Sequence, residues 1–174
     1  MQELGKLIKK CALFEHVDAD AAGSFLQQAQ VMRFAKGNKI IEQGSLGEGM
    51  YIIAEGKVGV VLEISQHERA ELSVLSEGDV LGEMSLLISM PRTATAIAKE
   101  DVQLYFIDAS DIKQSVAQHD AQAMQMIFNL AKILAKRLHQ CNEFLSTLWS
   151  ERNNIDYLQQ ALENGQILLA KVLG

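Results

Sequence analysis

The chain has 174 residues and a formal net charge of −6 at pH 7, and 48% of its residues are apolar. This length fits one main hydrophobic core with an appendage, and the apolar content excludes a disordered or collagen-like chain. Because the net charge is acidic, we do not expect the surface as a whole to bind the phosphates of a nucleic acid.

The first 30 residues are expected to form a helical lead-in. Between residues 3 and 11, apolar side chains recur at helical spacing, namely Leu4, Leu7, Ile8 and Cys11. This pattern predicts a first helix, which the segment around Leu13 interrupts. A second short helix is predicted from Asp20 to Gln28.

Residues 31–120 change to short runs typical of β-strands. The clearest runs are 31–34, 39–42, 50–54, 57–64, 71–75, 93–98 and 103–107. Glycines or polar turns separate them and no helices alternate with them, which favours an antiparallel sandwich or jelly roll over a parallel sheet. We therefore expect a mainly β fold with flanking helices.

The C-terminal part, residues 121–174, is expected to be helical after a short helix that begins near Asp108 and ends near His119. Its apolar residues alternate spacings of four and three: Ile127, Ala131, Leu134, Leu138, Cys141, Leu145 and Leu148. This heptad spacing indicates either a homodimer seam along the Ile127–Leu148 helix or packing on the chain's own β unit. The apolar pattern resumes after residue 154, either in one continuous helix or in a second helix after a turn, and Asn153 and Asn154 favour the break.

The segment 82–94 combines residue types suited to an anionic ligand. Gly82 permits a tight turn, and Glu83 begins a short helical turn whose first N–H groups have no intrahelical acceptor. Arg92 carries a guanidinium fork that fits a phosphate, and Thr93 adds a hydroxyl beside it. On these residues alone, a phosphate site and a surface ion pair between the glutamate and the arginine both stay open.

This segment closely resembles the phosphate-binding cassette of cyclic-nucleotide-binding domains, the family of the bacterial catabolite activator, the protein kinase A regulatory subunits and the gated channels. The similarity extends over about Cys11 to Glu143 and implies an eight-stranded jelly-roll β-barrel with N-terminal helices and long C-terminal helices. Every fixed place of the cassette pattern is matched, and the expected ligand-binding residues are Gly82, Glu83, Met84, Ser85, Arg92, Thr93 and Ala94.

The resemblance also implies a role for each group. Glu83 would accept a hydrogen bond from the ribose 2′-hydroxyl, and Arg92 would bind the cyclic phosphate. The backbone N–H groups of Met84 and Ser85 would contact phosphate oxygens, and Thr93 would contact the phosphate or the base.

The expected ligand is cAMP, with cGMP as the alternative, because the Thr93 hydroxyl is compatible with either nucleotide. The long helix would cover the purine, with Cys141 and Asn142 as candidate base contacts. We expect no metal and no other cofactor, because the histidines and the two cysteines lack the spacing of metal ligands. Both cysteines are predicted to be buried or inert thiols.

The expected function is a regulatory sensor without enzymatic activity, which rearranges its C-terminal helices toward an unidentified effector protein. The alternative is a structural or interaction module of the same fold that has lost nucleotide binding. No basic recognition helix follows Trp149, so we expect no direct DNA binding. No apolar run approaches the ~18 residues of a membrane span, which predicts a cytoplasmic protein without a membrane contact.

Overall fold

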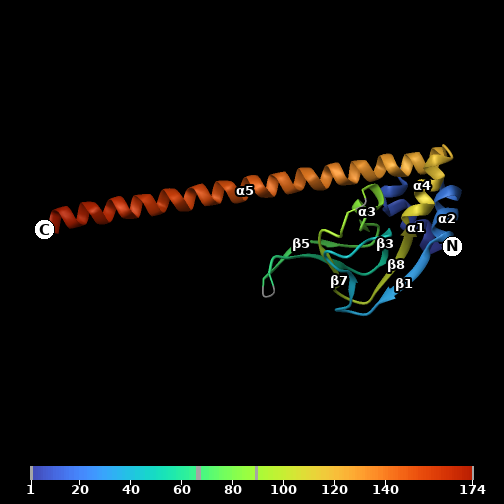
Figure 1. The fold of residues 1–174 in the computed structure, drawn as a ribbon, viewed down its shortest axis with the longest axis horizontal. Helices are drawn as coiled ribbons and strands as arrows, with labels where there is room; N and C mark the ends of the chain where they lie inside the picture. The colour runs from blue at the N-terminus through green and yellow to red at the C-terminus, as the bar shows by residue number, and fades with distance from the viewer. Residues whose placement is uncertain (1, 66–67, 89, 174) are drawn as a thin grey trace. The chain divides into compact units, whose positions relative to one another are not determined.

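The computed structural model describes residues 2–65, 68–88 and 90–173 of the chain. The chain divides into two compact units, Met1–Ala131 and Lys132–Gly174, each of which is considered by itself. The first unit contains all the strands, and Figure 1 shows helices α1, α2 and α4 gathered at one end of them.

The strands of the first unit form two four-stranded antiparallel sheets. The first sheet has the order β1-β8-β3-β6, with β1 at Gln30–Phe34, β8 at Val102–Asp108, β3 at Gly49–Glu55 and β6 at Val80–Leu81. The second has the order β2-β7-β4-β5, with β2 at Lys39–Ile41, β7 at Thr95–Ala98, β4 at Val58–Glu63 and β5 at Arg69–Leu75. The predicted mainly β fold of eight strands is confirmed.

The two sheets form a sandwich and, unlike those of the expected β-barrel, are not closed into a barrel. Closure would require hydrogen bonds between the outer strands of the two sheets, whereas β1, β6, β2 and β5 each pair with a neighbour on one side only. Apolar residues from both sheets fill the space between them and hold the layers together. This core comprises Ile41, Ile53, Val58, Leu81, Ala96, Ala98, Val102 and Leu104.

One strand had no counterpart among the predicted runs. Strand β6 has two residues, Val80 and Leu81, which is too short for an alternating apolar pattern to be seen in the sequence. It pairs with Tyr51 and Ile52 of β3 and leads directly into the segment 82–94. The predicted run 93–98 also begins two residues early, because β7 starts at Thr95.

Both predicted N-terminal helices are confirmed. Helix α1 spans Gln2–Lys10 and α2 spans Ala19–Gln28, and a short 3₁₀ helix at Ala12–Phe14 lies between them. The Asp18 carboxylate caps α2 by accepting hydrogen bonds from the backbone N–H groups of its first turn.

The C-terminal helical prediction is confirmed, but the predicted break is wrong. Helix α4 spans Ala109–Ala117 and is capped by Asp108, and α5 runs without interruption over Ala121–Leu173. Asn153 and Asn154 do not end the helix because asparagine lowers helix stability by well under the ~3 kcal/mol that proline costs. None of the helices within the described residues combines the length and the apolar character needed to cross a bilayer.

The first turns of α5 bury a face that differs from the predicted stripe. Ala123, Met126 and Leu130 are buried, whereas Ala131 of the stripe is exposed. Asn129 lies on the same buried face and is 1% exposed. A polar side chain in this position requires hydrogen bonds, because burial removes its water.

Asn129 ties the start of α5 to the N-terminal helical segment. Its Nδ2 donates to the backbone oxygens of Leu13, at 2.9 Å, and Glu15, at 2.6 Å. Two helical turns earlier, Oε1 of Gln122 accepts a hydrogen bond of 2.8 Å from the backbone N–H of Asp18. Two amide side chains of α5 therefore bind the backbone on either side of the turn that leads into α2.

The two cysteines lie in different environments. Cys11 is buried, and burial raises the pKa of its thiol to about 11, so this thiol stays neutral near pH 7. Cys141 is exposed and is a free thiol. The prediction of buried or inert thiols is therefore confirmed for Cys11, and for the exposed Cys141 an inert thiol stays a prediction.

We expect Asn129→Ala to lower the free energy of unfolding by about 2 kcal/mol, because two backbone carbonyls lose their donor. The matched control is Asn142→Ala, since Asn142 lies on the same helix and is exposed. Chemical denaturation of both variants tests the tie. If the two substitutions changed the unfolding free energy equally, the two hydrogen bonds of Asn129 would contribute nothing.

Candidate functional site

Along the chain, the segment 82–94 connects β6 of the first sheet to β7 of the second sheet. The backbone turns at Gly82, which has a φ of +75°, and enters the short helix α3 at Met84–Leu87, with Glu83 as its N-cap. Three polar side chains of this segment are buried: Glu83 is 5% exposed, Ser85 6% and Arg92 9%. Buried charges are rare in proteins, which makes this cluster the candidate site.

The guanidinium of Arg92 is held by oxygen atoms from two elements. Its Nη1 donates to the carbonyl oxygen of Gly82 at 2.6 Å and to the hydroxyl of Ser85 at 2.5 Å. Its Nη2 donates to the carbonyl oxygen of Gly49, at the start of β3, at 2.7 Å. The Ser85 hydroxyl in turn donates to the Gly82 carbonyl at 3.1 Å.

These bonds leave part of the guanidinium available to a ligand. An arginine side chain carries five N–H groups, two on each Nη and one on Nε. Both groups on Nη1 and one on Nη2 are engaged, so within the described residues Nε–H and one Nη2–H have no protein acceptor. A fork of two N–H groups matches the two free oxygens of a phosphate diester.

The backbone of Arg92 is held by the loop 42–48, which joins β2 to β3. The Arg92 N–H donates to the carbonyl oxygen of Ser45, and the Arg92 carbonyl accepts from the N–H of Gly44, both at 2.8 Å. The sequence did not indicate that this loop belongs to the site. It is more than 40 residues away along the chain, and its site-forming groups are main-chain atoms.

The positive charge of Arg92 is retained despite its burial. Burial lowers the pKa of the guanidinium, and the nearby Tyr51 and Glu83 act in the opposite direction by favouring the charged form. Because the pKa of an arginine lies far above neutral pH, the guanidinium stays protonated. Burial raises the pKa of Tyr51, and Arg92 opposes that rise, which identifies Tyr51 as a further neighbour of the site.

The remaining predicted residues are distributed as follows. Thr93 is exposed and its hydroxyl lies 3.9 Å from the sulfur of Met84, which is itself 37% exposed. Ala94 is half-buried beside them. Cys141 and Asn142 are exposed residues of the second unit. The structure therefore brings Gly82, Glu83, Ser85 and Arg92 together, with Met84 and Thr93 beside them.

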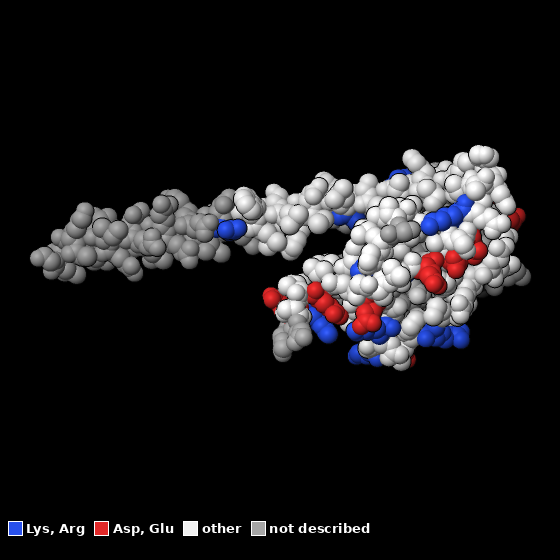
Figure 2. Space-filling view, viewed as in Figure 1, with Lys and Arg blue, Asp and Glu red and all other residues white. Residues whose placement is uncertain are grey.

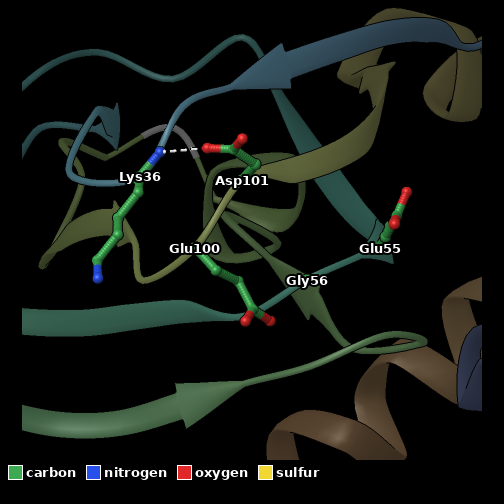
Figure 3. A pocket seen from close by; sticks show the side chains of 5 residues that line it. All are labelled: Lys36, Glu55, Gly56, Glu100 and Asp101. Carbon is green, nitrogen blue, oxygen red and sulfur yellow. Dashed lines mark hydrogen bonds between the residues drawn. The ribbon is translucent and has the colours of Figure 1, made fainter.

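An open hollow elsewhere in the first unit is a weaker candidate. Figure 3 shows its lining, which includes the carboxylates of Glu55, Glu100 and Asp101 and the backbone N–H of Lys36, which donates to Asp101 at 2.9 Å. Three carboxylates against one ammonium disfavour an anionic ligand. Figure 2 shows acidic and basic side chains interspersed on the face turned to the viewer, without a continuous basic area that would suit a nucleic acid.

Comparison with known proteins identifies relatives for most of the chain. The profile of the cyclic nucleotide-binding domain matches residues 31–119, just over half of the chain. The cyclic AMP receptor protein of Thermus thermophilus is 31% identical over 152 residues, which cover 86% of this chain and 68% of that protein.

A CRP-like cAMP-activated global transcriptional regulator of Mycobacterium tuberculosis is 24% identical over 145 residues, or 83% of this chain. The chain spans 63% of the length of that regulator. Among solved structures, the Thermus thermophilus catabolite activator protein superposes with a TM-score of 0.70 at 30% identity, over 79% of this chain and 62% of that one.

We expect Gly82→Ala to lower the free energy of unfolding by about 1 kcal/mol more than Gly37→Ala does. Both glycines have a positive φ, +75° and +86°, so alanine is strained at either position. A Cβ at Gly82 would also collide with Nη1 of Arg92, whereas the space at Gly37 is open. Chemical denaturation compares the two variants, and equal losses would mean that displacing Arg92 costs nothing in the free protein.

Proposed function

The chain belongs to the cyclic nucleotide-binding domain family, and we propose on this basis that it is a regulatory sensor module that binds cAMP at the segment 82–94. The observation that carries the proposal is the buried guanidinium of Arg92, which is positioned by three acceptors and keeps two N–H groups for an anion. A cyclic nucleotide supplies a monoanionic phosphate diester of the matching geometry.

In the proposed complex, Arg92 binds the two free oxygens of the cyclic phosphate. The backbone N–H groups of Met84 and Ser85 lie in the first turn of α3, where helix geometry provides no intrahelical acceptor, and they contact the same oxygens. Glu83 accepts a hydrogen bond from the ribose 2′-hydroxyl, and Thr93 contacts the phosphate or the base.

We propose cAMP over cGMP because both curated relatives described above carry cyclic AMP in their names. Cys141 and Asn142 are the candidate contacts for the purine. We propose no enzymatic activity for the module, since its relatives described above are a receptor protein and a transcriptional regulator. The nucleotide would act as a regulatory ligand and not as a substrate.

An alternative is a structural or interaction module of the same fold that does not bind a nucleotide. It is favoured by the satisfaction of three Arg92 donors within the protein itself. The sensor is favoured by the two remaining N–H groups of Arg92, which a purely structural module would not need.

The proposed output is a change in the position of the C-terminal segment, residues 121–174, toward an effector protein. The stripe on α5 offers an apolar contact surface, because Leu138 is 62% exposed, Leu145 55% and Leu148 44%. Since this stripe has heptad spacing, we propose that it forms a homodimer seam. Ligand binding would then favour one arrangement of the helices over another.

Arg92→Ala is expected to weaken cAMP binding by at least about 100-fold, because the phosphate loses its charged, bidentate partner. The matched control is Arg33→Ala, since Arg33 is exposed and its side chain donates to Gln103 across the sheet, away from the segment 82–94. Isothermal titration calorimetry with cAMP and cGMP measures both variants and the unchanged protein.

Two results would contradict the proposal. Absence of heat with either nucleotide at millimolar concentration would favour the structural module over the sensor. Equal affinities of the Arg92→Ala and unchanged proteins would mean that the nucleotide binds elsewhere.

The double substitution Leu138→Glu with Leu145→Glu is expected to convert a dimer to a monomer, because it buries two charges in an apolar seam. The control introduces the same two charges off the stripe, as Gln140→Glu with Thr147→Glu. Sedimentation velocity reports the mass of each protein, and circular dichroism reports whether the helices persist. A monomeric unchanged protein, or a control that dissociates equally, would argue against the seam.

A further inference from the structure

In the loop 42–48, Gly47 has no side chain, and the guanidinium of Arg92 occupies the space where one would lie. Gly47 is half-buried, and a Cβ built on it would overlap Cζ and Nε of Arg92 and would lie 2.7 Å from Nη2. These are distances that real Cβ atoms do not show, so the Nε, Cζ and Nη2 atoms of Arg92 occupy the space that a side chain at position 47 would need. The two residues are far apart in the sequence and adjacent in space.

The backbone conformation of Gly47 does not itself require glycine. In the same loop, Gly44 has a φ of +82°, which strains any other residue, although the space beside it is open. Gly47 is not among the residues with positive φ. The three nearest obstacles to a Cβ at position 47 are therefore all atoms of the Arg92 guanidinium.

Hydrogen bonds at residues 43–45 hold the loop against Arg92 and β4 and oppose a movement that would relieve such a clash. Gly44 and Ser45 are hydrogen-bonded to the backbone of Arg92 itself, at 2.8 Å each. The Gln43 side chain donates to the carbonyl oxygen of Glu63 and accepts from its N–H, which fixes the loop to β4 as well. The Arg92 side chain is long and flexible, so its guanidinium would be displaced from the position that its hydrogen bonds define.

We propose that Gly47 is a positioning residue for ligand binding, which acts by directing the Nε–H and Nη2–H groups of Arg92 toward the phosphate. This inference rests on the proposed function, because those are the two N–H groups assigned above to the cyclic phosphate. The Gly82 carbonyl and the Ser85 hydroxyl hold the Nη1 end of the guanidinium, and Gly47 sets the orientation of the opposite edge.

Gly47→Ala should consequently preserve the fold and impair binding. The added methyl group would clash with the guanidinium at the end of the flexible Arg92 side chain. The protein therefore accommodates the methyl group by displacing that guanidinium. The control is Gly23→Ala in α2, where a Cβ would meet nothing within 4 Å. It adds the same methyl group away from the site.

The first experiment uses the ligand-free protein. The Nε–Hε signals of the arginines are recorded by ¹H–¹⁵N NMR, and the signal of Arg92 is assigned with the Arg92→Lys variant. We expect this signal to shift in Gly47→Ala and to stay in place in Gly23→Ala, with thermal unfolding midpoints near that of the unchanged protein. An unmoved Arg92 signal in Gly47→Ala would overturn the inference, whatever the protein binds.

The second experiment measures cAMP affinity by calorimetry. We expect Gly47→Ala to bind cAMP about tenfold or more weakly than the unchanged protein, and Gly23→Ala to bind cAMP with unchanged affinity. When Gly47→Ala is added to the Arg92→Lys variant, we expect no further loss of cAMP affinity. Unchanged affinity, or an equal loss in both backgrounds, would refute a positioning role. If the unchanged protein binds no cyclic nucleotide, the proposed function fails and the NMR signal still decides whether Gly47 places Arg92.

Discussion

The buried guanidinium of Arg92 is the interaction on which the rest of the site depends. Removing a positive charge from water is costly unless polar groups surround it. Here the carbonyls of Gly82 and Gly49 and the hydroxyl of Ser85 supply them, from the segment after β6 and from the start of β3. The same side chain thus organises the turn, the helix α3 and the loop 42–48 around one point, and retains donors for an anion.

The sequence allowed a good prediction of the residues that carry charge and a poor one of the main-chain atoms that position them. Glu83 and Arg92 were recognised because their pattern in one short segment is specific, and both are buried in the structure. Gly47 and the Gly49 carbonyl were not, because a glycine or a carbonyl oxygen leaves no chemical signal in the sequence. Their role follows only from the pairing that brings the loop against Arg92.

Periodicity predicted that α5 exists but not which of its faces is buried. The heptad stripe includes Ala131, which is exposed, whereas the polar Asn129 is buried because Leu13 and Glu15 offer it backbone acceptors. A hydrophobic pattern cannot register such a partner, since the acceptors belong to a distant turn. The short strand β6 escaped prediction for a related reason: two residues acquire their conformation from pairing with β3 and not from any pattern of their own.

The central claim, that Arg92 presents a preformed donor fork to a cyclic phosphate, is tested most directly by a crystal structure of the chain grown with cAMP. We expect the phosphate oxygens within hydrogen-bonding distance of Nε and Nη2 of Arg92, with the bonds to Gly82, Ser85 and Gly49 retained and the ribose 2′-hydroxyl on Glu83. A nucleotide bound away from Arg92, or an arginine that abandons all three acceptors to reach the phosphate, would contradict the claim.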